Sequence, residues 1–197
     1  MATSEPPPRR LVVGVTGASG TILARSVLSL LGAAGVERHL VVSAAAKRTA
    51  GVEWPEGHLE SMAEVVYPWR DIGAPIASGS FATDGMIVVP CSVRTMSSVA
   101  FGITDSLIAR AADVTLKERR RLVLSLRESP LHLGHLRAML AVTEAGAIVA
   151  PPLPLFYESP ASIDELVDQM AGRLVGLLGV ESKAVRPWSG VRARPSP

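Results

Sequence analysis

The stretch "VVGVTGASGTI", Val12–Ile22, decides how the rest of the chain is interpreted. Residues typical of a buried strand run into a turn of small residues, and an apolar segment with helix-like spacing follows. In such a unit the backbone N–H groups of the turn face an anion at the N-terminus of the helix. The stretch therefore predicts a nucleotide-phosphate site, to which Ser19 can add a hydroxyl group.

Short apolar runs alternate with helical patterns along the rest of the chain. Their continuous Val, Leu and Ile character is typical of strands buried on both faces of a parallel sheet. We expect strands at Leu11–Val15, Arg38–Val42, Met86–Val89, Leu122–Leu126 and Ala147–Ala150. We expect helices at Ile22–Ala34, Ala44–Gly51, Thr95–Phe101, Ser106–Arg119, Leu133–Ala145 and Ile163–Leu178. This order predicts a single doubly wound, Rossmann-like α/β domain with a mainly parallel sheet, whose ligands bind beyond the C-terminal ends of the strands.

The composition limits the class of protein. With 197 residues, the chain is long enough for one domain with a sizeable core. It is 48% hydrophobic and 19% charged, with a mean hydropathy of +0.31, so we expect apolar surface to be buried between subunits of a homo-oligomer. The net charge of +2 gives no reason to expect a nucleic-acid partner.

Signals for location are few. No apolar run has the length of a signal-peptide core or of a membrane span, so we expect no membrane association. The single cysteine, Cys91, excludes an internal disulfide framework and is typical of a reducing cytoplasm. Because both ends are rich in Pro, Ser and Arg, we expect a flexible tail at 1–9, one domain at 10–180 and a C-terminal tail at 181–197.

The glycine spacing excludes several nucleotide-binding classes. The pattern from Gly14 to Gly20 is G-x-x-G-x-x-G, which is not the dinucleotide fingerprint, and no Lys follows to make a Walker A loop. Neither Tyr67 nor Tyr157 has the Lys four positions later that a short-chain dehydrogenase needs. Ser43 stands where an NAD-binding protein carries an acidic residue. An NAD-dependent enzyme is therefore not expected.

A second loop resembles the first. The segment "PCSVRT", Pro90–Thr95, follows the third expected strand with small polar residues and precedes another helix. Two such loops at neighbouring strand ends can hold one phosphorylated ligand. Ordinary N-capping of the helix explains Cys91, Ser92 and Thr95 equally well, and both interpretations stay open.

Charged residues gather in the segment "ARAADVTLKERRRLVLSLRESP". Arg110 and Lys117 are seven positions apart and share one face of a helix. Arg127 and Glu128 directly follow the fourth expected strand, at the ligand edge of the sheet. A carboxylate among cations there can be a fixed hydrogen-bond partner or a proton-transfer group.

Three further positions have competing explanations. Tyr157, in "PPLPLFYESP", follows the fifth expected strand and so lies at the ligand edge. Arg173 lies in the middle of an apolar helix, where an arginine usually extends its head group to the surface. His132 and His135 have the spacing of a metal-ligand pair, but no further ligand completes a site, so we expect no metal.

Taken together, these segments resemble the UbiX-type flavin prenyltransferases, also called the Pad-like or phenolic acid decarboxylase-like family. The resemblance covers Leu11 to Val180. It rests on the order and spacing of "TGASG", "ASGSF", "GMIVVPCS", "RAADVTLKERR", "LRESPLHLGHL" and "PPLPLFY". It implies a flavoprotein fold and a metal-independent, cytoplasmic enzyme that joins dimethylallyl phosphate to N5 and C6 of reduced FMN. The product, prenylated FMN, serves UbiD-type decarboxylases, and the enzyme is a homo-oligomer, commonly a dodecamer, with sites shared between subunits.

The resemblance also implies roles for individual residues. The FMN contacts would be Gly17, Ala18, Ser19, Ser43, Ser92, Val93, Arg94, Thr95 and Arg127. The prenyl phosphate would be held by Arg110, Lys117, Glu128, Tyr157 and Arg173, with Trp188 able to cover the site. Catalysis would involve Ser19, Glu53, Arg110, Lys117 and Glu128, with either Glu128 or the released phosphate as the base. Leu23 and Ala44 depart from the Tyr and Lys that family members often carry at these positions.

Two alternatives remain. A flavin-carrying accessory subunit of a decarboxylase would share the FMN loops, but it would not need a second phosphate pocket. A flavin-dependent cysteine decarboxylase of the same superfamily would need a catalytic His after the first helices and a "PASANT"-like loop, which this sequence does not contain.

Overall fold

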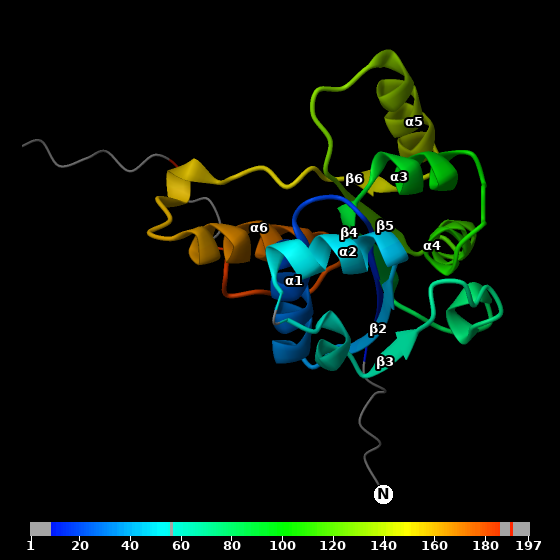
Figure 1. Ribbon diagram of the computed structural model, residues 1–197, viewed down its shortest axis with the longest axis horizontal. Coiled ribbons are helices and arrows are strands. Elements are labelled where there is room, and N and C mark those ends of the chain that lie inside the picture. Colours follow the sequence, from blue (N-terminus) through cyan, green and yellow to red (C-terminus); the bar gives the residue numbers. More distant parts are fainter. Residues whose placement is uncertain (1–8, 56, 186–189, 191–197) are drawn as a thin grey trace, which may run out of the picture.

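A parallel sheet forms the centre of the computed structural model, which describes residues 9–55, 57–185 and 190. Within these residues six strands pair in the order β3-β2-β1-β4-β5-β6, and every pairing is parallel (Figure 1). The strands are β1 (Arg10–Val15), β2 (Glu37–Val42), β3 (Val65–Tyr67), β4 (Gly85–Cys91), β5 (Arg121–Leu126) and β6 (Ile148–Val149). The predicted doubly wound α/β fold is confirmed.

Helices cover both faces of the sheet (Figure 1). They are α1 (Thr21–Ala33), α2 (Ala44–Glu53), α3 (Val93–Ala100), α4 (Leu107–Lys117), α5 (Leu133–Glu144) and α6 (Ile163–Leu177), with short 3₁₀ turns at Leu59–Met62, Pro75–Ala77 and Phe156–Glu158. One buried cluster joins α1 and α6 to one face of the sheet, and a second cluster joins α3, α4 and α5 to the other face. The sheet therefore separates α6 from α4.

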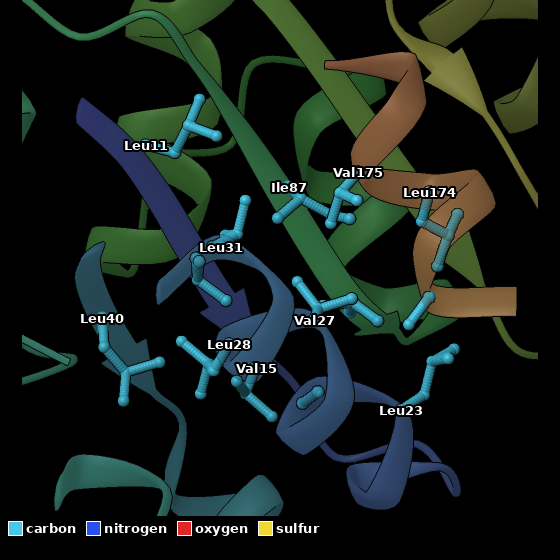
Figure 2. Close-up of a cluster of buried hydrophobic side chains, with 14 of the residues drawn as sticks. Leu11, Val15, Leu23, Val27, Leu28, Leu31, Leu40, Ile87, Leu174 and Val175 are labelled. Atoms are coloured by element: carbon cyan, nitrogen blue, oxygen red, sulfur yellow. The ribbon is translucent and has the colours of Figure 1, made fainter. Parts of the chain in front are cut away.

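The core beneath α1 shows why this segment is helical. Its apolar residues recur every three or four positions, and Val27, Leu28 and Leu31 are fully buried. Figure 2 shows these side chains lying between the strands and Leu174 and Val175 of α6. Fully burying a side chain of this size contributes about 1.5–3 kcal/mol. This packing holds α1 against the sheet.

The edges of the sheet differ from the prediction. The strand β3 was not expected, because three partly exposed residues give no periodic pattern. The strand expected at Ala147–Ala150 is shorter, since only Ile148 and Val149 pair with β5. The other predicted strands and helices are found within two residues of their expected limits at each end.

Two side-chain contacts hold β3 in place. The guanidinium of Arg38 pairs with Glu64 and holds the pKa of that carboxyl at about 2. On β2, the buried His39 ring is hydrogen-bonded to the Tyr67 hydroxyl at 2.8 Å through Nδ1 and to Glu37 at 2.8 Å through Nε2. The residues that follow β3 are thereby held at the ligand edge of the sheet.

The ends of the described chain lie against α6 and the turn that follows it. Arg9 donates hydrogen bonds to the carbonyl oxygens of Leu178 and Gly179, so the ordered domain already includes this residue of the expected tail. The segment 182–185 packs against α6, where a Cβ on Gly172 would come within 2.7 Å of Val185. Trp188 lies outside the described residues. In the part of the chain that is described, no helix is long and apolar enough to cross a membrane.

Candidate functional site

The loops after β1 and β4 meet where the order of the strands reverses. In a doubly wound sheet, the connections diverge at this point and leave a crevice for ligands. The buried hydroxyl of Thr16 donates to the carbonyl of Pro90 at 2.7 Å and accepts from the backbone N–H of Ser92 at 2.8 Å. The two loops predicted from the sequence therefore form one unit.

A cleft of about 480 Å³, here called cleft A, opens on this unit. Residues in the first turns of α2, α3 and α4 all contribute to its lining. Ser43, Ser92 and Ser106 are the N-caps, and their side chains accept from backbone N–H groups at 3.1, 3.3 and 3.3 Å. Ser92 is thus both an ordinary cap and part of a cleft wall. Three helix N-termini facing one space favour the binding of an anion there.

Gly17 allows the first loop to lie directly against α2. A Cβ added at this position would lie 2.3 Å from the Cβ of Ala45, a distance that carbon atoms cannot adopt without displacement of the backbone. The requirement for glycine therefore comes from close packing at the wall of cleft A, and any side chain at this position would push the loop and α2 apart.

A second cleft, of about 410 Å³ and here called cleft B, uses the other side of the same loops. Ser19, Arg127 and Glu128 are polar residues of its lining, and the backbone N–H of Arg127 donates to the carbonyl of Cys91 at 3.0 Å. The apolar walls consist mainly of Ile22, Leu23, Leu126, Leu153, Val167 and Met170. Next to it, a groove that shares Leu153 and Met170 is lined by Arg173. Cleft B thus combines a largely apolar lining with a cation and a carboxylate.

Glu53, the last residue of α2, caps the N-terminus of α1. Its carboxylate accepts from the backbone N–H groups of Gly20 at 3.0 Å and of Thr21 at 2.7 Å, and from the Thr21 hydroxyl at 2.6 Å. Burial raises the pKa of Glu53, but hydrogen bonds from Thr21, Ser19 and Gly20 outweigh this effect and leave the pKa below its ordinary value. The carboxylate therefore stays ionised and ties the end of the first loop to α2, the helix against which Gly17 also packs.

Glu53→Gln is expected to lower the free energy of unfolding at pH 7 by about 1 kcal/mol, a cap-sized loss that includes screening by solvent. Because the pKa is lowered on folding, the carboxylate stabilises the protein above the unfolded value of 4.5, and this contribution disappears as the pH falls. Urea unfolding should therefore show a difference in the free energy of unfolding between wild type and Glu53→Gln that decreases below about pH 4.5. The control is Glu144→Gln at the exposed end of α5, which should leave stability unchanged. A difference in the free energy of unfolding that does not change with pH would contradict the capping role of Glu53.

Comparison with known proteins identifies the family. The flavoprotein family model matches residues 2–174. A flavin prenyltransferase UbiX from Archaeoglobus fulgidus is 51% identical over 174 residues, which are 87% of this chain and 96% of the relative. A second, from Escherichia coli K12, is 46% identical over 170 residues, 85% of this chain and 90% of the relative. The chain belongs to the UbiX-type flavin prenyltransferase family.

Solved structures of UbiX-type proteins have the same fold. The crystal structure of AnUbiX (PadA1) in complex with FMN and dimethylallyl pyrophosphate matches with a TM-score of 0.91 at 46% identity, over 94% of this chain and all of that one. The dodecameric, FMN-dependent UbiX-like decarboxylase from Escherichia coli O157:H7 matches with a TM-score of 0.88 at 42% identity, over 92% of this chain and all of that one. The peptidyl-cysteine decarboxylase EpiD, at 16% identity and a TM-score of 0.58, shares the fold alone.

The residues to which the UbiX-type resemblance assigns roles are divided between the two clefts and other parts of the chain. Gly17, Ser43, Ser92, Arg94 and Thr95 line cleft A, whereas Ser19, Arg127 and Glu128 line cleft B. Ala18 lies in the first loop between Gly17 and Ser19, and Val93 is the first residue of α3. Tyr157 lies in the 3₁₀ turn Phe156–Glu158 after β6 and is 54% exposed.

Arg110 and Lys117 line neither cleft. They lie on α4, on the face of the sheet opposite Arg173. Arg110 donates to the carbonyl of Ala77 at 3.2 Å and to Asp113 at 3.0 Å, and Lys117 pairs with Glu118 at the far end of α4. One chain of this UbiX-type protein therefore does not bring all five predicted prenyl-phosphate ligands together.

Cleft A also contains residues that sequence reasoning did not select. Arg48, on the second turn of α2, and Trp69 and Arg70, after β3, belong to its lining. Arg48 gave no signal, since a charged residue on a helix is usually solvated. Trp69 and Arg70 were missed together with β3, whose end places them at this edge. Among the described residues, no three His, Cys, Asp or Glu side chains are grouped to hold a metal ion.

Proposed function

We propose that this protein joins dimethylallyl phosphate to N5 and C6 of reduced FMN and so makes prenylated FMN. The observation that carries the proposal is the pair of clefts on one set of loops. Cleft A is suited to the phosphate end of a flavin, and cleft B combines apolar walls with the polar side chains of Arg127 and Glu128. The names of its relatives, and a UbiX structure with FMN and a dimethylallyl ligand, support this interpretation.

Cationic side chains explain how the prenyl group can leave its phosphate. Departure of phosphate needs positive charge at the leaving oxygen atoms, which Arg and Lys supply through charge-assisted hydrogen bonds. The apolar walls of cleft B would pack against the five-carbon prenyl group. Reduced FMN would supply the two nucleophilic atoms: N5 would lose its proton on displacing the phosphate, and C6 would lose its proton on bonding to the far end of the prenyl double bond, whose other carbon would take up one proton. We assign to Glu128 the removal of the proton from C6, because its carboxylate belongs to the lining of cleft B.

The position of α4 supports a site shared between subunits. Since the sheet separates Arg110 and Lys117 from Arg173 within one chain, these two cations would reach cleft B from a neighbouring copy. The Escherichia coli O157:H7 relative is described as dodecameric, and closed oligomers of this kind bring different faces of identical chains together. We further propose that a UbiD-type decarboxylase receives the product and that the enzyme works in the cytoplasm, as its single cysteine indicates.

The decisive experiment is mass spectrometry of the flavin after anaerobic incubation of the protein with reduced FMN, dimethylallyl phosphate and excess EDTA. We expect a flavin heavier by one five-carbon prenyl unit. Bound but unchanged FMN would support the accessory-subunit alternative. Activity that is lost in EDTA and restored only by Mg²⁺ would overturn the metal-independent mechanism.

A further inference from the structure

Three arginines line cleft A, and two of them already have partners. The guanidinium of Arg94 pairs with Asp105 at 2.9 Å, and that of Arg70 lies 4.7 Å from the centre of the Trp69 ring. Arg48 has no hydrogen bond, ion pair or ring contact with any described residue. Among the arginines of the cleft lining, Arg48 is therefore the one whose guanidinium has no partner among the described residues.

The position of Arg48 on α2 brings its charge toward the helix N-terminus. It follows the cap Ser43 by five positions, and side chains in a helix lean toward the N-terminal end. Its membership of the cleft lining agrees with this direction. The positive end of α2 and the guanidinium of Arg48 thus lie at the same wall.

The electrostatic balance of cleft A favours a doubly charged anion. Each of the three helix N-termini contributes roughly half a positive charge. The acid in the lining, Asp105, is neutralised by Arg94. A phosphate monoester carries nearly two negative charges at neutral pH, and an arginine can hold two of its oxygen atoms at once.

We propose that Arg48 binds the terminal phosphate monoester of the flavin and makes the enzyme prefer FMN to riboflavin, which has the same ring system and no phosphate. This inference rests on the proposed function, because it takes the flavin to be the ligand of cleft A. Arg48 would thus discriminate between FMN and riboflavin at cleft A, whereas prenyl transfer itself is proposed to occur at cleft B.

The test compares the affinities of FMN and riboflavin, measured by flavin fluorescence, in wild type and Arg48→Gln. We expect the substitution to lower the affinity for FMN roughly 10-fold or more and to change the affinity for riboflavin less than about 2-fold. The matched control is Lys47→Gln, which removes the same charge one position away. Lys47 pairs with Glu60 at 2.8 Å and does not line cleft A, so neither ligand should be affected.

The other outcomes are distinct. The inference would be overturned if Arg48→Gln lowered the affinities for FMN and riboflavin equally, since a structural effect would explain that result. It would also be overturned if Lys47→Gln lowered FMN affinity as much as Arg48→Gln does, since a long-range effect of charge would then suffice. Unchanged FMN affinity in Arg48→Gln would overturn it directly. If the wild type binds neither flavin, the proposed function itself fails. Partial recovery of FMN affinity in Arg48→Lys would support a role for charge at this position.

Discussion

Lys117→Ala and Arg173→Ala are each expected to lose prenyl transfer by about 100-fold or more, whereas mixed oligomers of both chains should regain activity. The sheet places the two residues on opposite faces of one chain. A shared site takes Lys117 from one subunit and Arg173 from another. It is intact when an Arg173→Ala chain supplies Lys117 and a Lys117→Ala chain supplies Arg173. Random mixing makes this true for roughly a quarter of the sites. Co-expression with two different tags, followed by the flavin assay, measures the recovery.

The control mixes Glu128→Gln with Arg173→Ala. Glu128 lines cleft B and Arg173 lines the adjoining groove, which shares Leu153 and Met170, so one chain supplies both residues to a given site. This mixture should stay inactive. Recovery in the control, or none in the Lys117 and Arg173 mixture, would contradict the shared site.

Glu128→Gln is expected to keep FMN affinity near that of the wild type and to slow product formation roughly 100-fold or more. The amide preserves the shape of the side chain but removes its charge and its basicity. Arg127→Gln should show the reverse pattern and lose FMN affinity first, since the family resemblance gives Arg127 to the flavin. Flavin fluorescence titration and single-turnover product formation separate the two effects.

Two results would change this division of labour. Normal turnover in Glu128→Gln would make the released phosphate the base. Loss of FMN binding in Glu128→Gln would place Glu128 among the flavin contacts instead. Both variants lie at exposed positions after β5, so their far-UV circular dichroism should match that of the wild type.

The central strands and the two loops were predictable because their constraints are local. Continuous apolar residues mark buried strands, and a turn of small residues between a strand and a helix marks each of the two loops. The three residues of β3 carry no such pattern, and their position depends on contacts of Arg38 and His39 from a neighbouring strand. Trp69 and Arg70 were therefore also missed.

The helical spacing correctly placed Arg110 and Lys117 on the same helix. It did not show which face of the sheet this helix covers, because that depends on how the chain crosses over between strands. The family resemblance grouped these residues with Arg173, and within one chain the fold places them on the opposite face of the sheet from Arg173. Arg48 was unpredictable for a different reason: only its place in the lining of cleft A distinguishes it from a solvated arginine.

Cys91 is the only cysteine of the chain and stands between Pro90 of cleft B and Ser92 of cleft A. Its thiol is fully buried, and burial raises its pKa to about 12. At pH 7 the thiol is therefore kept in its protonated form, whereas peroxide and alkylating reagents attack the thiolate. Burial therefore protects this sulfur from oxidation. Because Cys91 becomes accessible only when β4 opens, the rate of its alkylation measures this opening. The same measurement can follow the unfolding of every variant described above without an added label.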